Sequence, residues 1–572
     1  MADNTDPIIA FSDFTFQYHA QSKPTLHNIN LTIHRGEKVL IAGPSGSGKS
    51  TIAHCINGLI PFSYLGECTG SCKIAGRETR ELSLFEISRT VGTVLQDSDA
   101  QFVGLTVAED IAFALENDCV PRDELLTRVA DAAKAVNIEA LLSHAPHEVS
   151  GGQKQRVSLA GVMIGNVDVL LFDEPLANLD PATGKQAIEL IDEVQKKTGA
   201  TVVIIEHRIE DVLHRDVDRV VLLNRGQIVF DDTPDRLLCS ETLRENGLRE
   251  PLYITALKYA GITLTEQMHP AHIETVVLDA DARHKLADWF EKTPPAPPAP
   301  ERETLFSAEH IQFTYPNGKK ALHDITMTLK KGEIACIVGQ NGAGKSTFSK
   351  LICGFEKPDS GTLTLNGENM TGMTIKERAD HIGYVMQDPN QMISKNMIFD
   401  EVALALRLDG MDEDAVRERV EETLKTCGLY PFRNWPISAL SFGQKKRVTV
   451  ASILATRPEI ILLDEPTAGQ DFKHYTEIME FLLELNRAGV TIVMITHDMH
   501  LMLEYAPRAV VFTDGRIVTD DTAANVLTNP AIIETAHLKE TSLFTLAVRA
   551  GIDDPRAFVQ RFIDHDREVR RA

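Results

Sequence analysis

Short apolar runs rich in β-branched residues alternate along the chain with longer amphipathic stretches. Thr201–Ile205 and Thr491–Ile495 are continuous runs of this kind, which are typical of strands buried on both faces of a sheet. Longer stretches such as residues 129–142 place their apolar residues at helical spacing. Strands that alternate with helices predict α/β units with largely parallel sheets.

The same series of motifs occurs twice. Val-Leu-Ile-Ala-Gly-Pro-Ser-Gly-Ser-Gly-Lys-Ser-Thr at 39–51 is echoed by Ala-Cys-Ile-Val-Gly-Gln-Asn-Gly-Ala-Gly-Lys-Ser-Thr at 335–347. Val-Leu-Leu-Phe-Asp-Glu-Pro at 169–175 is echoed by Ile-Ile-Leu-Leu-Asp-Glu-Pro at 460–466. The repeat continues into Ala-Gly-Ile at 260–262 and again at 550–552. The sequence therefore predicts two copies of one unit, each with a short tail.

A proline-rich segment separates the copies. Residues 293–300 read Thr-Pro-Pro-Ala-Pro-Pro-Ala-Pro, which favours an extended polyproline spacer of roughly 25 Å. We expect a first domain over residues 1–240 with a tail over 241–292, a linker over 293–300, a second domain over 301–530 and a C-terminal tail over 531–572.

Composition excludes several classes of protein. The 572 residues carry 58 Lys and Arg against 82 Asp and Glu, a formal net charge of −24, which argues against a sequence-independent nucleic-acid binder. No apolar run reaches the eighteen or so residues that cross a bilayer, and the acidic start is unlike a secretory signal. The 8 cysteines fit a reducing compartment, and no second Cys or His pair completes a zinc set with Cys68 and Cys72. We expect a cytoplasmic protein.

Two glycine-rich loops carry the clearest chemistry. Gly-x4-Gly-Lys-Ser follows an apolar strand and opens a helical segment in both copies, the context that a phosphate-binding loop requires. Backbone N–H groups and the helix N-terminus would bind the phosphates, Lys49 and Lys345 would reach the β- and γ-phosphates, and Ser50 and Ser346 would hold Mg²⁺. The candidate ATP-binding residues of the two loops are Gly43, Pro44, Ser45, Gly46, Ser47, Gly48, Lys49, Ser50 and Thr51, and Gly339, Gln340, Asn341, Gly342, Ala343, Gly344, Lys345, Ser346 and Thr347.

Acidic and histidine residues follow later strands of each copy. Asp173 and Asp464 end apolar runs, so they should emerge at the carboxyl edge of the sheet and hold Mg²⁺. The next residues, Glu174 and Glu465, are placed to polarise the attacking water as general bases. One strand later come His207 and His497, which we expect to contact the γ-phosphate.

A further motif carries a resemblance to a known family. Val-Ser-Gly-Gly-Gln-Lys-Gln-Arg at 149–156 and Leu-Ser-Phe-Gly-Gln-Lys-Lys-Arg at 440–447 resemble the signature sequence of ABC transporter ATPases. Together with the loops, the Asp-Glu pairs and the histidines, they give the family's order of motifs twice. The resemblance implies two domains that each have a mainly parallel sheet, an antiparallel β region and a helical subdomain. It also implies that Gln96 and Gln387 act in catalysis and bind Mg²⁺, and that Tyr18 and Tyr315 stack on adenine.

The signature has a physical interpretation beside the familial one. A Ser-Gly-Gly-Gln helix start exposes a hydroxyl and backbone amides that suit an anion. In the family the signature closes over ATP bound to the opposite domain, so the two domains of this chain should pair with each other. The signature residues that this resemblance assigns to ATP are Ser150, Gly151, Gly152 and Gln153 in the first copy and Ser441, Gly443 and Gln444 in the second.

The two copies are not identical, and the difference bears on activity. Phe442 replaces a signature glycine and could crowd the phosphate of the first site or pack beside it. His207 sits in Glu-His-Arg, whereas His497 sits in Thr-His-Asp. Because both glutamates remain, we expect two hydrolytically competent but unequal sites.

Residues near Gln96, whose segment resembles the family's Q-loop, point to one class within the family. The segments at 96–113 and 387–403 are similar to ATPases of energy-coupling-factor importers, which take up vitamins, vitamin precursors, cobalt or nickel. The resemblance implies that this face docks integral-membrane subunits and that the chain is peripheral to the cytoplasmic face of the membrane. Phe102, Val103 and Met392 should then be partly exposed. The alternatives are a tandem sugar-importer ATPase and a soluble ABC-F-like ribosome-associated ATPase.

Overall fold

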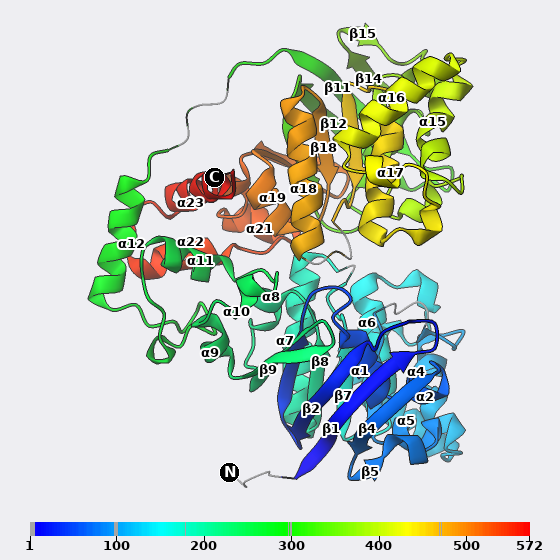
Figure 1. Cartoon of the computed structure of the whole chain (residues 1–572), viewed down its shortest axis with the longest axis vertical. Coiled ribbons are helices and arrows are strands. Elements are labelled where there is room, and N and C mark those ends of the chain that lie inside the picture. The colour runs from blue at the N-terminus through cyan, green and yellow to red at the C-terminus, as the bar shows by residue number, and fades with distance from the viewer. Residues whose placement is uncertain are drawn as a thin grey trace. The chain divides into compact units, whose positions relative to one another are not determined.

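The computed structural model describes residues 6–96, 101–177, 179–295, 297, 300–467, 470 and 472–571. The chain divides into two compact units, Met1–Leu286 and Ala287–Ala572, and Figure 1 labels many of the strands and helices of each. Each unit contains a four-stranded antiparallel sheet and a six-stranded, mostly parallel sheet. The predicted α/β class with an antiparallel β region is confirmed.

The first unit builds its sheets in the orders β2-β1-β4-β5 and β10-β9-β3-β8-β7-β6. Among the strands that the structure describes in the larger sheet, only the β9–β10 pair is antiparallel. The strands are β1 (Pro7–Tyr18), β2 (Leu26–His34), β3 (Lys38–Ala42), β4 (Gly66–Ile74), β5 (Arg77–Glu78), β6 (Val91–Val94), β7 (Val169–Asp173), β8 (Thr201–Ile205), β9 (Arg219–Asn224) and β10 (Gln227–Asp232).

The second unit repeats this topology, with sheet orders β12-β11-β14-β15 and β16-β17-β18-β13-β19-β20. Its only antiparallel pair in the larger sheet, among the described residues, is β19–β20. The strands are β11 (Thr304–Thr314), β12 (Lys320–Lys330), β13 (Ile334–Val338), β14 (Ser360–Leu365), β15 (Glu368–Asn369), β16 (Ile382–Val385), β17 (Ile460–Asp464), β18 (Thr491–Ile495), β19 (Arg508–Thr513) and β20 (Arg516–Asp521).

The apolar runs form the centres of the two large sheets. All residues of β3, β8, β13 and β18 are buried, as expected of parallel strands covered on both faces. Both strands predicted from β-branched runs, Thr201–Ile205 and Thr491–Ile495, have the predicted limits. Asp173 and Asp464 end β7 and β17, so each lies at the carboxyl edge of its sheet.

Helices flank the sheets in both units. Those of the first domain are α1 (Lys49–Ile56), α2 (Leu59–Phe62), α3 (Leu84–Ser88), α4 (Val107–Asn117), α5 (Arg122–Ala135), α6 (Gly151–Met163), α7 (Pro181–Thr198) and α8 (Ile209–Val212). Those of the second are α13 (Lys345–Cys353), α14 (Ile375–Ala379), α15 (Ile398–Leu408), α16 (Glu413–Thr426), α17 (Phe442–Leu454), α18 (Phe472–Arg487) and α19 (Met499–Tyr505). Short 3-10 turns lie at Thr79–Glu81, Glu139–Leu141, Pro146–Glu148, Glu266–Met268, Pro389–Gln391, Tyr430–Phe432 and Ile437–Ala439.

One predicted helix has different limits from those expected. The helical pattern at residues 129–142 is covered only up to Ala135 by α5, which begins earlier, at Arg122 after Pro121. Asn137 has φ 58°, a left-handed conformation that a continuing helix cannot contain. A separate 3-10 turn then covers Glu139–Leu141.

The tails are helical and repeat one another in part. The first domain ends with α9 (Pro234–Leu238), and its tail contains α10 (Thr242–Glu245), α11 (Leu252–Tyr259) and α12 (Ala280–Lys292). The second domain ends with α20 (Ala523–Val526), and α21 (Pro530–Ala536), which begins at the domain's last residue, leads into the tail with α22 (Ser542–Ala550) and α23 (Pro555–Arg571). The repeated Ala-Gly-Ile ends α11 and α22, with Gly261 and Gly551 at φ 71° and 76°.

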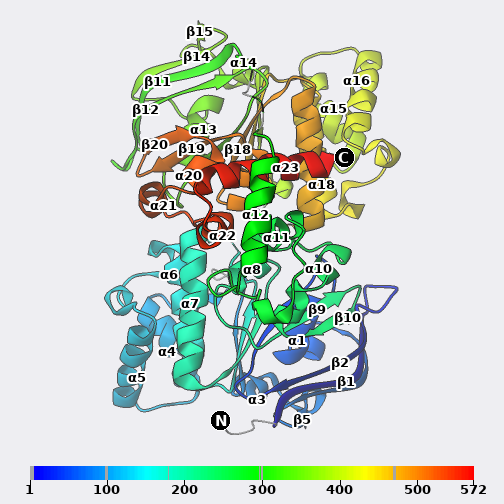
Figure 2. The same ribbon diagram turned by 90° about the vertical axis from the view of Figure 1, so that its left-hand side faces the viewer.

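Helix α12 spans the boundary between the two units. Its last residues, Ala287–Lys292, belong to the second unit and pack on α23, as Figure 2 lets the reader follow. The rings of Trp289 and Phe558 meet edge to face at 5.5 Å, and the Arg561 guanidinium lies 4.1 Å from the centre of the Phe290 ring. The tail that follows the first domain thus ends on the tail of the second.

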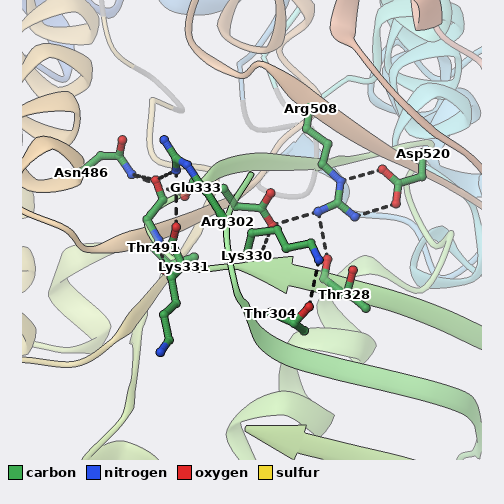
Figure 3. Close-up of polar contacts among 11 residues, drawn as sticks. Arg302, Thr304, Thr328, Lys330, Lys331, Glu333, Asn486, Thr491, Arg508 and Asp520 are labelled. Atoms are coloured by element: carbon green, nitrogen blue, oxygen red, sulfur yellow. Dashed lines mark hydrogen bonds and ion pairs between the residues drawn. The ribbon is translucent and has the colours of Figure 1, made fainter. Parts of the chain in front are cut away.

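A network of arginine contacts links strands of the second unit (Figure 3). Arg508 donates two hydrogen bonds to Asp520, at 2.7 and 2.6 Å, and others to Glu333 at 2.8 Å and the Thr328 carbonyl at 2.9 Å. It therefore connects β12, β19 and β20 with Glu333, the residue directly before β13. Arg302, directly after the proline-rich segment, donates to the Gly332 carbonyl in the turn before β13.

None of the helices in the described part of the chain is both long and apolar enough to span a bilayer.

Candidate functional site

The glycine-rich loops lie where the sequence predicts. Residues 43–48 join β3 to α1, and residues 339–344 join β13 to α13. Gly48 and Gly344, directly before the helices, have φ 104° and 102°. A Cβ at Gly344 would lie 2.7 Å from the Leu322 Cδ2 atom and 3.0 Å from the Ala321 carbonyl oxygen. Glycine is therefore required at these two positions, which aim the helix N-termini at the loops.

Both loop lysines are buried and folded onto their own loops. Lys49 donates to the carbonyls of Gly43 at 2.7 Å and Pro44 at 3.0 Å. Lys345 makes the equivalent bonds to Gly339 at 2.7 Å and Gln340 at 2.9 Å. The next residues, Ser50 and Ser346, are exposed. An ammonium group held inside an amide-lined loop, beside a free hydroxyl, suits an anion with a bound cation.

The predicted adenine-stacking tyrosines lie beside these loops. The Tyr18 hydroxyl is 3.1 Å from the Thr51 hydroxyl, and the Tyr315 hydroxyl is 2.9 Å from the Thr347 hydroxyl. In the first unit the Tyr18 ring also meets Tyr64 edge to face at 6.3 Å, and Tyr64 stacks on His54 at 4.4 Å. The sequence did not single out Tyr64 and His54, because no motif contains them.

Sheet order brings the other candidates to the same edge. In the first unit β3 pairs with β8, β8 with β7 and β7 with β6. The phosphate loop, His207, the Asp173-Glu174 pair and Gln96 follow these strands, so they leave neighbouring carboxyl ends. The Gln96 side-chain amide donates to Glu174 at 2.7 Å, which shows that two of the predicted residues are in direct contact.

Asp173 has the electrostatics of a cation ligand. Desolvation by burial, followed by the charge of Glu174, raises the pKa of Asp173 to about 6. Its Oδ1 atom is buried and has no hydrogen-bond partner among the described residues. A buried carboxylate oxygen without a donor is costly unless a cation binds it. This oxygen therefore fits a divalent cation held between the phosphate loop and the sheet.

In the second unit the predicted base Glu465, His497 and Thr496 form one cluster. His497 Nδ1 lies 2.7 Å from Glu465 Oε1, and the Thr496 hydroxyl donates to Glu465 Oε2 at 3.1 Å. The backbone N–H of His497 also donates to Glu465, at 3.1 Å. The predicted base and the predicted γ-phosphate contact are thus hydrogen-bonded to each other here.

In the first unit a different acid holds the histidine. His207 Nδ1 lies 3.1 Å from Glu206 Oε1, and Glu206 has no exposed surface. Sequence reasoning named Glu206 only as part of Glu-His-Arg and gave it no role. Its position at the end of a buried strand, directly before the histidine, was the available signal.

Two further residues of the second site were missed. The buried Lys446 donates to the carbonyls of Gln387 and Glu465, both at 2.9 Å. Tyr384, in β16, donates to Asp464 at 2.9 Å. Lys446 lies within the signature segment, where a lysine is expected to be exposed on a helix. Tyr384 lies in a short strand that contains no motif.

The signature residues begin α6 and α17. Ser150 and Gln153 form a reciprocal cap, with bonds of 2.8 and 3.4 Å, and Ser441 and Gln444 do the same at 3.0 and 3.3 Å. Both serines are exposed, and the Phe442 side chain is 42% exposed. The loops after the bases are only partly described, since Asn178, Ala468, Gly469 and Asp471 lie outside the described residues.

Comparisons with known proteins agree with this site. A family described as "ABC transporter" matches residues 26–177 and 322–468, and one described as "ATP-binding cassette cobalt transporter" matches residues 240–313. A relative from Clostridium perfringens, described as an ABC transporter ATP-binding protein, is 59% identical over 98% of this chain and 99% of its own length. One from Vibrio vulnificus with the same description is 52% identical over 98% of each.

Among solved structures, cbiO1 from Clostridium perfringens, described as part of the ABC transporter complex cbiONQ, is 33% identical to this chain. It covers 41% of this chain and 94% of its own, with a TM-score of 0.39. The extent of the curated matches, together with both phosphate loops and their acidic partners, shows the family. The chain belongs to the ATP-binding proteins of ABC transporters and is an ATP hydrolase with two ABC domains.

Proposed function

We propose that this chain hydrolyses ATP at two sites to drive an importer of the energy-coupling-factor type, through integral-membrane subunits that dock beside Gln96 and Gln387. The observation that carries this proposal is the 2.7 Å hydrogen bond from Gln96 to Glu174. Gln96 follows β6 and precedes an apolar surface segment, so a partner seated on that segment can act on the base through one side chain.

The segment after Gln96 has the character of a docking surface. The Val103 and Leu105 side chains are 64% and 81% exposed, and Phe102 is partly exposed. Asp110 accepts the backbone N–H groups of Val103 and Gly104 at 2.8 and 3.1 Å, which holds the segment against α4. Apolar side chains fixed in solvent mark an interaction site for an apolar partner. Residues 97–100 lie outside the described residues.

The second unit offers an equivalent surface after Gln387. Met392 is partly exposed, and the backbone N–H groups of Ser394 and Lys395 donate to Glu401 at 2.9 and 2.6 Å. Glu401 in α15 thus acts on this loop as Asp110 in α4 acts on the first. Two such loops, one per domain, match a partner that receives a movement from both.

The roles of the site residues follow from chemistry. Lys49 and Lys345 bind the β- and γ-phosphates, and the loop amides and helix N-termini complete the phosphate cradle. Mg²⁺ would be held by Ser50, Gln96 and Asp173 in one site and by Ser346, Gln387 and Asp464 in the other, where it supplies positive charge to the phosphates. Glu174 and Glu465 polarise the attacking water, and His207 and His497 contact the γ-phosphate.

Pairing of the two domains within the chain completes each site. Ser441, Gly443 and Gln444 would close over ATP on the first phosphate loop, and Ser150 to Gln153 over ATP on the second. The exposed serine hydroxyls and helix N-termini support this role. ATP would hold the domains together, and hydrolysis would release them and move the membrane partner.

The cargo is selected by the membrane partner. Residues 240–313 match a family described as "ATP-binding cassette cobalt transporter", which supports a metal ion as the solute, with a vitamin or vitamin precursor as the other cargo classes of this importer type. The chain would work at the cytoplasmic face of the membrane as a peripheral subunit.

Affinity purification of the tagged chain from membranes of its native host tests the docking. We expect an integral-membrane protein to co-purify, and Leu105→Glu to abolish this. Val229→Glu, which changes a 43% exposed residue on β10 at the opposite edge of the sheet from β6, serves as the control. Ribosomes in place of a membrane protein would support the ABC-F alternative, and a sugar permease the sugar-importer alternative.

Single replacements test the catalytic proposal. Glu174→Gln and Glu465→Gln should each leave measurable ATP turnover, and the double variant should lose it by 10²–10⁴-fold, the typical contribution of a positioned base. If one single replacement abolishes turnover while the other leaves it untouched, the proposal of two competent sites is wrong.

A further inference from the structure

The two sites differ in the residue that precedes the histidine. Glu206 in the first unit and Thr496 in the second both follow a central strand, β8 or β18, and neither has exposed surface. Their backbone N–H groups make equivalent bonds to the phosphate-loop strands, Glu206 to Ile41 at 3.2 Å and Thr496 to Ile337 at 3.1 Å. The positions are therefore equivalent, and the difference lies in the side chains.

Thr496 supports the base of its own site. Its hydroxyl donates to Glu465 at 3.1 Å, while His497 Nδ1 lies 2.7 Å from the other oxygen of the same carboxylate. Base, histidine and threonine therefore form one hydrogen-bonded unit, and a change in one should alter the others.

In the first unit His207 contacts Glu206 rather than the proposed base. Its Oε1 atom accepts the backbone N–H groups of His207 at 2.9 Å and Arg208 at 3.2 Å, and it lies 3.1 Å from His207 Nδ1. Glu174, the base of this site, is bonded to Gln96. Histidine and base thus have separate partners in the first site.

The buried carboxylate also braces the loop after the base. Glu206 Oε2 accepts the backbone N–H of Leu176 at 3.3 Å, and the Arg208 guanidinium donates to the Leu176 carbonyl. The Arg208 Nε atom lies 3.9 Å from Glu206 Oε1. The Leu176 amide and the Arg208 side chain therefore both hold the Glu206 carboxylate beside His207.

We infer that Glu206 is a positioning residue for hydrolysis at the first site. By accepting the backbone N–H of His207 and lying 3.1 Å from its Nδ1 atom, it holds the imidazole so that Nε2 can donate to the γ-phosphate, while Glu174, bonded to Gln96, polarises water. The negative charge of Glu206 strengthens the hydrogen bond that it accepts from the His207 backbone N–H. The inference rests on the proposed roles of Glu174 and His207 and adds that the first site uncouples base from histidine, whereas the second couples them.

Turnover of the first site alone tests the role. In a Glu465→Gln background, Glu206→Gln removes the charge but keeps an oxygen acceptor for the backbone amides. We expect kcat for ATP to fall between about 10- and 100-fold, as misplaced catalytic groups do, with KM changed less than twofold. Glu206→Thr introduces the residue that the second site has at the equivalent buried position. It should also lower kcat with little change in KM. Agreement between the two variants would exclude a folding defect specific to Glu206→Gln.

A double-mutant comparison distinguishes positioning from bracing. If Glu206 acts through His207, then Glu206→Gln should cause no further loss of kcat when His207→Ala is already present. An equal loss with and without His207 would show that Glu206 only braces the Leu176 loop and would overturn the inference. So would an unchanged kcat in the Glu206→Gln protein.

The background itself separates this inference from the proposed function. If the Glu465→Gln chain hydrolyses no ATP before Glu206 is changed, the first site is not competent and both statements fail. If it hydrolyses ATP and Glu206→Gln has no effect, only the role of Glu206 fails. Melting temperatures of all variants, measured with and without ATP, check that the first site still binds nucleotide.

Discussion

The Tyr384 hydroxyl donates a hydrogen bond of 2.9 Å to Asp464, the aspartate at the end of β17. Asp173 of the first unit corresponds to Asp464 and ends β7. Its Oδ1 atom is buried and has no hydrogen-bond partner among the described residues. The same motif residue thus accepts a side-chain hydrogen bond in one unit, whereas in the other one of its carboxylate oxygens has no partner among the described residues. The two sites should differ in how much they depend on a bound cation.

Asp173→Asn tests the cost of the buried carboxylate. The pKa of Asp173 rises from 3.8 to about 6 through burial, so the folded chain binds the extra proton between these values and loses stability as the pH rises through them. At pH 7.5 the penalty is fully present and amounts to about 3 kcal/mol, at 1.36 kcal/mol per unit. Asp173→Asn should therefore raise the melting temperature of the nucleotide-free chain at pH 7.5.

The pH and the second site provide the controls for this measurement. At pH 4 the same substitution should have much less effect, because the folded-state carboxyl is already protonated. Asp464→Asn should stabilise less, since Tyr384 already donates to that carboxylate. A melting temperature that falls with Asp173→Asn at pH 7.5 would contradict the assignment.

Lys446 should stabilise the second unit through its two carbonyl contacts. Lys446→Met removes the donor to the part-buried carbonyls of Gln387 and Glu465. A fully buried unpaired acceptor costs about 1–3 kcal/mol and a part-buried one less, so the urea midpoint of the second unit should fall. Lys446→Gln, which copies Gln155 of the first unit, keeps one donor and should lose less. Equal losses for Met and Gln would argue against the carbonyl contacts.

Gly344→Ala should impair folding of the phosphate loop and ATP binding together. Alanine at φ 102° is strained by about 1–3 kcal/mol, and its Cβ would lie 2.7 Å from Leu322 Cδ2. Titration with a fluorescent ATP analogue should show one site lost. Gly410→Ala is the matched control, because Gly410 also has positive φ, 76°, but no atom within 4 Å of an added Cβ. Both sites intact in Gly344→Ala would contradict the expected clash.

The contact of α12 with α23 should protect the proline-rich segment. Trp289→Ala removes the ring that meets Phe558, which has no exposed surface. Release of α12 should speed proteolytic cleavage within residues 293–300, as measured by the appearance of two half-length fragments. Val569→Ala, a change at a 44% exposed position on α23, should leave the cleavage rate unchanged. Equal cleavage rates in both variants would mean that the contact does not restrain α12.

Much of the fold followed from the sequence because its elements carry local signals. Buried β-branched runs gave the strand limits of Thr201–Ile205 and Thr491–Ile495, and glycine spacing gave both phosphate loops. The end of α5 was missed because it depends on the left-handed Asn137, a conformation that residue type only favours.

The contacts within the site were harder to predict than its members. Gln96, Asp173, Glu174 and His207 stand in motifs, but which of them touch depends on Glu206, a residue that motifs leave open. Lys446 is charged and lies on a helix, so its burial against two carbonyls follows only from packing. Residue type and spacing define the chemistry available, and tertiary neighbours decide the pairing.

The two proposed bases have a backbone conformation that glutamate does not favour. Glu174 and Glu465 have φ 48° and 45°, a conformation that costs a residue with a Cβ about 1–2 kcal/mol and glycine almost nothing. Glycine at both places would relieve this strain but leave the chain without its two proposed bases. Random mutagenesis selected for heat resistance alone should therefore recover Gly at 174 and 465, whereas selection for transport should reject it at both.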